Sequence, residues 1–160
     1  MTIQVGGRLP ASTLAKVTAD GPEQVDAASY FQGRRVILFS VPGAFTPTCS
    51  ARHLPGFVDK AADLRAKGIA EIACTAVNDA FVMKAWAEAS GVGDRITMLA
   101  DGNGAFARAI GLELDGSKFG MGLRAQRYAM VLNDGVVEAL HVEQPGEFRV
   151  SSAEHLLETL

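Results

Sequence analysis

Short runs of apolar residues mark the expected buried strands of this chain. Arg35–Val41 and Ile69–Val77 are rich in β-branched residues and stop at Pro42-Gly43 and Asn78-Asp79. Apolar runs of this length, with turn residues at their ends, are typical of strands that are buried on both faces of a sheet. A shorter run, Ile96–Ala100, predicts a third strand of the same kind.

Between the first two strands, the pattern changes to a helical one. The segment from Thr46 to Gly68 opens with Thr-Pro, which predicts Thr46 as the N-cap and Pro47 as the first helical residue. Pro55 lies inside the same helix, where it lacks an N–H and crowds the carbonyl of Ala51. We therefore expect a kink near Pro55.

Two more helices are predicted from the residues at which they begin. Asp79 can cap a helix over Ala80–Ala89. Ser151 and Glu154 have the Ser-x-x-Glu spacing of a capping box, which predicts a closing helix from Ser151 to Leu160.

Arg127–Asn133 and Val136–Val142 flank Asp134-Gly135, a dipeptide typical of a two-residue β-hairpin. A short helix is expected over Asn103–Ile110. Strands joined by helices run parallel through right-handed crossovers, whereas the hairpin adds antiparallel strands. The expected fold is α/β, a mixed central sheet with helices on both faces in the outline of a thioredoxin-like fold, formed by one domain over residues 1–160.

Composition narrows the class of protein. With 160 residues, 48% of them hydrophobic, the chain has enough apolar material for a core of its own. Its 15 basic and 18 acidic residues leave a net charge of −3, and no run of Lys or Arg could bind a phosphate backbone or an anionic membrane. No apolar stretch reaches about 18 residues, and the first residues do not resemble a signal peptide. We expect a soluble, cytoplasmic protein that has neither nucleic acid nor membrane as a partner.

The residues able to ligate a soft metal are two cysteines and three histidines: Cys49, Cys74, His53, His141 and His155. Two cysteines are too few for a disulfide framework, and they lack the Cys-x-x-Cys spacing of a dithiol oxidoreductase. Cys49 and His53 stand one helical turn apart, but two ligands alone rarely hold a metal. We therefore expect no metal site.

Cys49 falls in the first turn of the helix that Thr46 and Pro47 begin. There, the helix macrodipole and the unpaired backbone N–H groups favour a thiolate over a thiol. A free cysteine is, however, most often a small buried hydrophobic residue. Position alone fits both interpretations.

The residues before Cys49 read Pro42-Gly43-Ala44-Phe45-Thr46-Pro47-Thr48-Cys49 and contain a PxxxTxxC motif. This motif resembles that of the peroxiredoxins, in particular the peroxiredoxin 5-like or plant type II branch of the AhpC/TSA-like redoxin superfamily. The similarity continues in order along nearly the whole chain, through His53–Phe57, Val77–Phe81, Arg127–Met130 and Ser151–His155.

The resemblance implies a thioredoxin-fold antioxidant enzyme, a thiol peroxidase that reduces hydrogen peroxide and organic hydroperoxides. Cys49 would be the peroxidatic cysteine and would become a sulfenic acid, with no bound cofactor. Pro42, Thr46 and Arg127 would surround it. Their chemistry suits this role: Pro42 shields sulfur without offering an N–H, the Thr46 hydroxyl can orient a peroxide oxygen, and Arg127 adds a permanent charge. Arg124, three residues before Arg127, is expected on the surface.

Thiolate formation alone would not make such an enzyme fast. Lowering the pKa of a thiol from about 8.5 to about 6 raises its thiolate fraction at pH 7 by roughly 30-fold at most. The accompanying loss of nucleophilicity is roughly tenfold. Most of the rate is therefore expected from donors that align the O–O bond and stabilise the leaving oxygen, namely Thr46, the Cys49 backbone N–H and Arg127.

Cys74 shares one face of its predicted strand with Ile72 and Ala76, which favours a buried core thiol. The alternative is a resolving cysteine that forms a disulfide with Cys49. Some two-cysteine relatives carry a resolving cysteine late in the chain, where this sequence has Val150-Ser151-Ser152. Resemblance to the type II group then implies recycling by glutathione and a separate glutaredoxin, with thioredoxin as the other possible donor.

Two other functions fit parts of the sequence. His53 could serve as the base of a cysteine hydrolase, because it lies four residues after Cys49 on one helix face. A redox-sensing or holdase-type module could use the same cysteine without fast turnover. Four phenylalanines could form either an interface or part of the core, namely Phe45, Phe81, Phe119 and Phe148. The resemblance to the family implies a homodimer.

Overall fold

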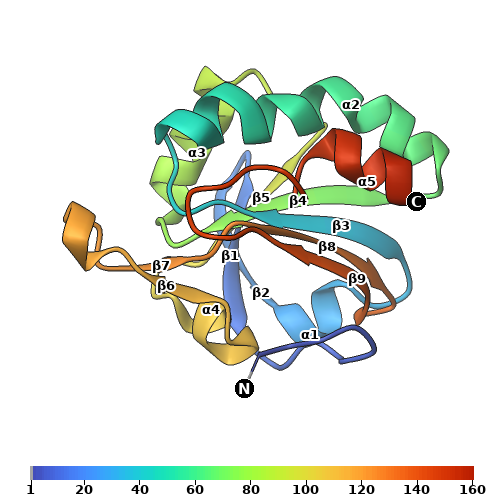
Figure 1. Ribbon diagram of the computed structural model, residues 1–160, viewed down its shortest axis with the longest axis horizontal. Coiled ribbons are helices and arrows are strands. Elements are labelled where there is room, and N and C mark those ends of the chain that lie inside the picture. The colour runs from blue at the N-terminus through green and yellow to red at the C-terminus, as the bar shows by residue number, and fades with distance from the viewer. Residues whose placement is uncertain (1) are drawn as a thin grey trace.

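A seven-stranded sheet forms the centre of the molecule in the computed structural model, which describes residues 2–160 (Figure 1). The strand order is β2-β1-β5-β4-β3-β8-β9. The three central strands are parallel, and they are β3 (Arg35–Ser40), β4 (Glu71–Ala76) and β5 (Thr97–Ala100). Strand β8 (Tyr128–Asn133) runs antiparallel to β3 and pairs in turn with β9 (Val136–Val142). The predicted strands are therefore confirmed, each within about two residues of its expected ends.

Helices cover both faces of this sheet, as predicted (Figure 1). One face carries α2 (Leu54–Ala66), α3 (Ala80–Ala89) and α5 (Ala153–Thr159), and the other carries α1 (Ala27–Tyr30) and α4 (Ala105–Ile110). Each layer has its own buried core, centred on Phe57 and Trp86 on the first face and on Phe31 and Phe106 on the second. Strand side chains point alternately into the two cores, which explains why β3 and β4 are apolar throughout.

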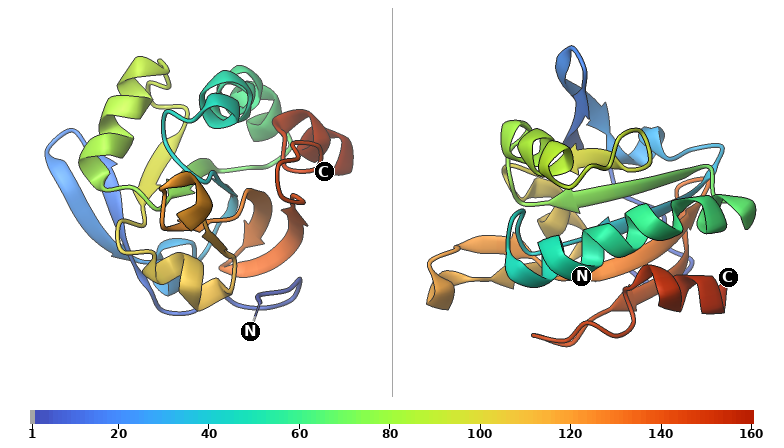
Figure 2. Two further views of the ribbon diagram at one scale, coloured as in Figure 1. Left: turned by 60° about the vertical axis from the view of Figure 1, so that its left-hand side comes forward. Right: turned by 90° about the horizontal axis from the view of Figure 1, so that it is seen from above.

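Two hairpins were not predicted. The first, β1 (Thr13–Thr18) with β2 (Gly21–Asp26), extends the sheet at the edge beyond β5. Strand β2 is mostly exposed and polar, so its sequence carries little strand signal. The second hairpin, β6 (Glu113–Asp115) with β7 (Leu123–Ala125), has three-residue strands and the short 3₁₀ helix η2 (Ser117–Phe119) near its tip. This hairpin projects from the body of the molecule (Figure 2).

The closing helix begins one residue later than its predicted capping box requires. Ser152, not Ser151, is the N-cap of α5, and its hydroxyl accepts a hydrogen bond from the His155 N–H at 3.1 Å. The Ser151 hydroxyl instead donates to Glu143. The expected capping box was wrong because a carboxylate from the end of β9 binds the Ser151 hydroxyl. The other predicted cap is present: Asp79 Oδ1 accepts from the Val82 N–H at the start of α3.

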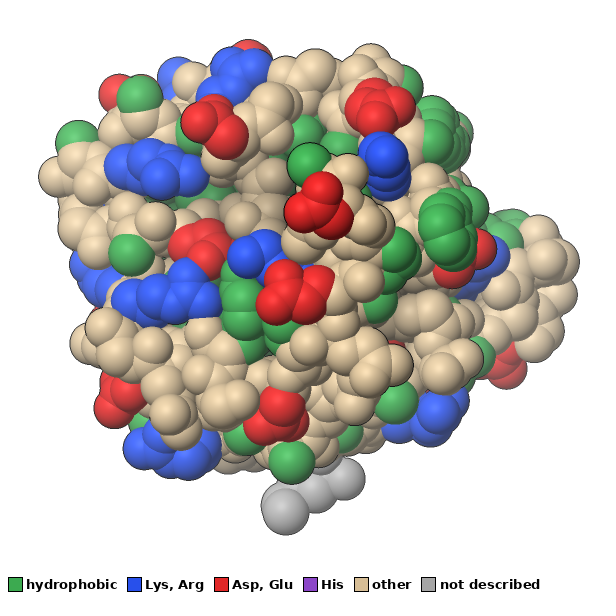
Figure 3. Space-filling view, turned by 180° about the vertical axis from the view of Figure 1, so that it is seen from behind, with side chains coloured by type: hydrophobic (Ala, Val, Ile, Leu, Met, Phe, Trp, Pro, Cys, Tyr) green, Lys and Arg blue, Asp and Glu red, His purple; other side chains and the backbone are tan. Residues whose placement is uncertain are grey.

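Charged side chains of both signs are interspersed on the face shown in Figure 3. Within residues 2–160, no helix is both long enough and apolar enough to cross a bilayer.

Candidate active site

Cys49 lies at the start of the helix that follows the end of β3. Helical backbone begins at Pro47, as predicted, so Cys49 is its third residue. From Cys49 to His53 the helix is a π-helix, η1, in which the Leu54 N–H donates to the Cys49 carbonyl. This wider turn ends at His53, two residues before Pro55, so the predicted irregularity takes the form of a π-turn, a feature often found at functional sites. The Cys49 side chain is fully buried.

Hydrogen bonds fix the loop before this helix. The Ala44 N–H donates to Asn78 Oδ1 at 2.9 Å, which ties the loop to the segment after β4. The Thr46 hydroxyl donates to the Gly43 carbonyl at 2.7 Å, and the Thr46 carbonyl accepts from the Ser50 N–H. Thr46 thus occupies the predicted N-cap position, but its hydroxyl bonds the preceding Gly43–Thr46 turn instead of a backbone N–H of the helix. Its hydroxyl oxygen keeps lone pairs for a substrate.

Sheet topology brings Arg127 to Cys49 across 78 residues of sequence. Strand β8 runs antiparallel to β3 in a register that pairs Tyr128 with Ser40, the last residue of β3. Arg127, just before β8, therefore lies beside the loop that leads to Cys49. Its Nη2 donates to Cys49 Sγ at 3.1 Å. A permanent positive charge therefore lies within hydrogen-bonding distance of the sulfur.

His53 holds the other side of the same guanidinium. Its Nδ1 accepts from Arg127 Nη1 at 2.9 Å, and its Nε2 donates to the Ser151 carbonyl at 2.9 Å. The ring is fully buried. Burial, followed by the Arg127 charge, lowers the pKa of His53 from 6.5 to about 3, against a smaller opposing effect of the Ser151 carbonyl. The hydrolase hypothesis needed a free basic nitrogen facing Cys49; both ring nitrogens of His53 are engaged elsewhere, and Arg127 bonds the sulfur instead.

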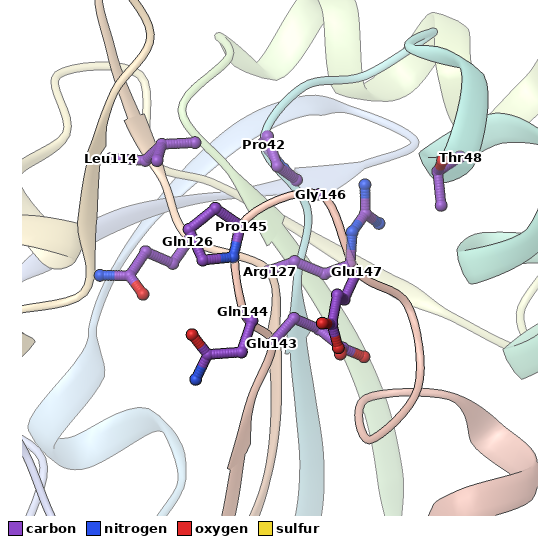
Figure 4. A pocket seen from close by; sticks show the side chains of 10 residues that line it. All are labelled: Pro42, Thr48, Leu114, Gln126, Arg127, Glu143, Gln144, Pro145, Gly146 and Glu147. Atoms are coloured by element: carbon purple, nitrogen blue, oxygen red, sulfur yellow. The ribbon is translucent and has the colours of Figure 1, made fainter.

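A pocket of about 300 Å³ opens beside these residues. Pro42 and Thr48 line it from the Cys49 side, and Arg127 lies within its wall. The opposite wall is the loop after β9, from Glu143 to Glu147. Figure 4 shows the Arg127 side chain extending from β8 toward the helix that carries Thr48.

Cys74 lies in β4 with no exposed surface, and both cysteines are free thiols. Burial raises the pKa of the Cys74 thiol well above its ordinary value, and nearby Cys49 raises it further, while Arg127 lowers it slightly. His141 and His155 form a separate edge-to-face pair, with ring centroids 4.9 Å apart. In the part of the chain that the structure describes, no three His, Cys, Asp or Glu side chains gather as a metal site would require.

Several residues near Cys49 were not predicted to act there. Arg124, expected on the surface, is half-buried and donates to the Val77 carbonyl beside the Cys49 loop. Phe148 packs edge-to-face on His53, with ring centroids 5.0 Å apart, and lies over the guanidinium of Arg52. Among the residues around Arg127 and Cys49 that were not assigned to the peroxidase site, only His53 could be noticed in the sequence, because it lies four residues after Cys49. The contacts of Arg124 and Phe148 join segments that are far apart in the sequence.

The family model described as Redoxin matches residues 4–157. The chain is 51% identical over 164 residues to the chloroplastic peroxiredoxin-2E-2 of Oryza sativa subsp. japonica, covering 99% of this chain and 73% of that one. It is 45% identical to peroxiredoxin-2B of Arabidopsis thaliana, covering 99% and 98%. Among solved structures, reduced Prx3 of Vibrio vulnificus in complex with H₂O₂ shares 51% identity at a TM-score of 0.95, covering 99% of each chain.

These similarities extend over nearly the whole chain. They confirm the predicted thioredoxin-like fold and thiol peroxidase function. The chain belongs to the redoxin family and is a peroxiredoxin of the plant type II kind.

Proposed function

We propose that Cys49 is the residue at which this peroxidase reduces hydroperoxides, with Thr46 and Arg127 orienting the peroxide. The 3.1 Å contact between Arg127 Nη2 and Cys49 Sγ carries this proposal. It places a donor with a permanent charge at the sulfur, and the second Arg127 nitrogen is held by His53. Cys74, by contrast, is buried in the sheet and its raised pKa keeps it a thiol.

The chemistry then follows from these positions. The Cys49 thiolate attacks the terminal peroxide oxygen, an S–O bond forms, and the O–O bond breaks. The leaving oxygen takes up a proton and departs as water or an alcohol. Negative charge moves from sulfur to the leaving oxygen in this step. Arg127 and the unpaired N–H groups of the first helical turn stabilise this developing charge. The peroxide reaches the buried sulfur from the pocket lined by Pro42, Thr48 and Arg127.

Recycling by external thiols completes the proposed cycle. One thiol condenses with the Cys49 sulfenic acid to a mixed disulfide and releases water, and a second thiol frees Cys49. Two thiols thus supply both electrons, and no bound cofactor is needed. Residues 150–152 offer no cysteine, and Cys74 lies within the sheet, where its raised pKa disfavours attack on Cys49. We propose glutathione with glutaredoxin as the donor in the cytoplasm, and thioredoxin as the alternative.

A peroxide-consumption assay tests both halves of this proposal. Glutathione plus glutaredoxin is compared with thioredoxin plus its reductase, on the wild type, Cys49→Ser and Cys74→Ser. We expect no turnover from Cys49→Ser and near wild-type turnover from Cys74→Ser with the glutathione system. Activity in Cys49→Ser would refute the role of Cys49, and loss of turnover in a folded Cys74→Ser would assign recycling to Cys74.

We also propose that the protein is a homodimer. Three exposed phenylalanines lie on segments that converge near residues 77–78: Phe45, Phe81 and Phe119, which are 54%, 73% and 82% exposed. Asn78 binds the Phe45 loop, α3 begins just after it with Phe81, and Arg124 ties the hairpin bearing Phe119 to Val77. Large exposed apolar side chains on neighbouring segments are typical of an interface.

Sedimentation tests the dimer. Phe119→Asp, and Phe81→Asp in a second variant, should convert a dimeric wild type to monomers that keep the circular-dichroism spectrum of the folded protein. A charged substitution at exposed Val5, which lies at the N-terminus away from the three phenylalanines in sequence, serves as the control and should remain dimeric. A monomeric wild type at micromolar concentration would contradict the proposal.

A further inference from the structure

One carboxylate oxygen of Glu143 accepts four hydrogen bonds from the end of the loop that follows β9. Glu143 Oε2 accepts from the backbone N–H groups of Arg149, Val150 and Ser151 at 2.8, 2.9 and 2.8 Å. The Ser151 hydroxyl donates to the same oxygen at 2.7 Å. Glu143 is only 6% exposed. Successive N–H groups around one anion form a nest, and here the chain's own carboxylate fills it.

The segment held in this way supports the active-site arginine. The Ser151 carbonyl accepts the Nε2 hydrogen of His53, whose Nδ1 accepts from Arg127. Phe148, on the same segment, packs on the His53 ring and lies 5.9 Å from the Arg127 guanidinium carbon. Glu143 also donates its backbone N–H to the Arg127 carbonyl. Four hydrogen bonds of 3.1 Å or less therefore link Glu143 to Cys49 through Ser151, His53 and Arg127.

We propose that Glu143 is a positioning residue for the peroxidase reaction, which fixes Arg127 against Cys49 through Ser151 and His53. The inference rests on the proposed role of Cys49. Glu143 also lines the pocket beside Arg127, but none of its hydrogen bonds in residues 2–160 reaches the sulfur, so we assign its effect on the reaction to these intermediates.

Physical chemistry explains why this connection matters. The intervening residues, 144–147, are exposed and include Pro145 and Gly146, so the loop has little packing of its own. Without the Glu143 carboxylate, three N–H groups lose their acceptor and the Ser151 carbonyl is free to move away from His53. The buried Nε2–H of His53 would then lack a partner, and Arg127 would lose the ring that orients it. A displacement of about 1 Å at reacting groups can cost roughly 100-fold in rate.

The carboxylate is charged under working conditions. Burial raises the pKa of Glu143, but the hydrogen bonds from the Ser151 hydroxyl and from three backbone N–H groups outweigh it, so the net shift is downward from 4.5. The connection is thus intact at neutral pH and weakens only when the pH falls below the ordinary range of a glutamate.

The test compares two reactions of the same sulfur in Glu143→Ala, Glu143→Gln and Ser151→Ala. Oxidation by hydrogen peroxide needs Arg127 in place, whereas alkylation by iodoacetamide needs only a reactive thiolate. Oxidation is followed by the fluorescence of Trp86, the only tryptophan, whose indole N–H donates to the Ser50 hydroxyl beside Cys49. Glu138→Gln is the matched control, because it removes a carboxylate of β9 that pairs with Arg35 away from the site.

We expect Glu143→Ala to slow peroxide oxidation by about 10- to 100-fold with a much smaller change in alkylation. Glu143→Gln keeps an acceptor oxygen and should recover part of the rate, and Glu138→Gln should match the wild type. In a double-mutant cycle, Glu143→Ala should add little to the loss already caused by His53→Ala.

Wild-type oxidation in a folded Glu143→Ala would overturn the proposal, as would equal losses in oxidation and alkylation or fully additive losses with His53→Ala. If the alanine variant does not fold, Glu143→Gln and Ser151→Ala decide by the same criteria. Cys49→Ser, run alongside, separates the two hypotheses: if it still consumes peroxide, the role of Cys49 fails, and if it does not, a negative result concerns Glu143 alone.

Discussion

Arg127 is held at two points, and this distinguishes it from a lysine at the same position. One guanidinium nitrogen bonds Cys49 Sγ and another bonds His53 Nδ1. A planar fork can satisfy both partners with a single geometry, whereas an ammonium on a flexible stem acts as a point charge. The charge near the sulfur would survive replacement by lysine, but the alignment would not.

Arg127→Lys should therefore reduce the rate constant for oxidation of Cys49 by hydrogen peroxide by about 100-fold, which is the range for loss of an aligned donor at a developing oxyanion. Alkylation by iodoacetamide should fall far less, because the positive charge remains. Stopped-flow Trp86 fluorescence measures the first rate and mass spectrometry the second. Equal losses in the two reactions would mean that Arg127 acts only by making a thiolate.

The site residues lie where helices and strands begin or end, so the ends of these elements determine its position. The Cys49 loop is pinned to Asn78, the residue just before the N-cap of α3. That cap, together with its helix, was predicted from Asp79. The π-turn at Cys49 was not, because the sequence at Pro55 indicates that the helix must adapt but not how.

Asp79→Ala should lower the free energy of unfolding by about 1 kcal/mol, the usual cost of losing a side-chain cap. The lost bond is that from the Val82 N–H to Asp79 Oδ1, at 2.8 Å. Urea denaturation checks this value. Asp59→Ala removes an exposed carboxylate within α2 and should change stability by less than about 0.5 kcal/mol. Equal effects of the two substitutions would contradict a capping role.

Across the whole molecule, burying His53 couples stability to pH. The ring has a pKa of about 3 in the fold, against an ordinary value of 6.5. Between these values the unfolded chain binds one proton more than the native protein, so the free energy of unfolding decreases as the pH falls. Linkage sets the slope from this one group at up to about 1.4 kcal/mol per pH unit.

Urea denaturation at several pH values between 7 and 4 should show this slope in the wild type and a shallower one in His53→Gln, which has no ring to protonate. His155→Gln, at a half-buried position on α5, should retain the His53 contribution. Parallel curves for the wild type and His53→Gln would show that His53 does not stay neutral in the native protein.

Local chemistry by itself determined much of this protein. Apolar runs indicated β3, β4, β5 and the β8–β9 hairpin, and Thr-Pro followed by Cys49 indicated a thiol at a helix start. Signals of this kind involve residues a few positions apart, so they are readable in the chain. The polar β2 and the three-residue strands β6 and β7 lacked such signals, and they appeared only in the structure.

The tertiary structure decided how the sulfur is surrounded. His53 is 74 residues from Arg127 and 98 residues from Ser151 in the sequence, yet it forms a hydrogen bond with each. Arg127 comes close to the Cys49 helix because β8 lies beside β3 in one register. In the folded chain the Ser151 hydroxyl donates to Glu143, and Ser152 therefore serves as the N-cap of α5. A hydroxyl or ring nitrogen can bond any partner that comes within reach, so its partner depends on strand order and register, which local residue patterns do not specify.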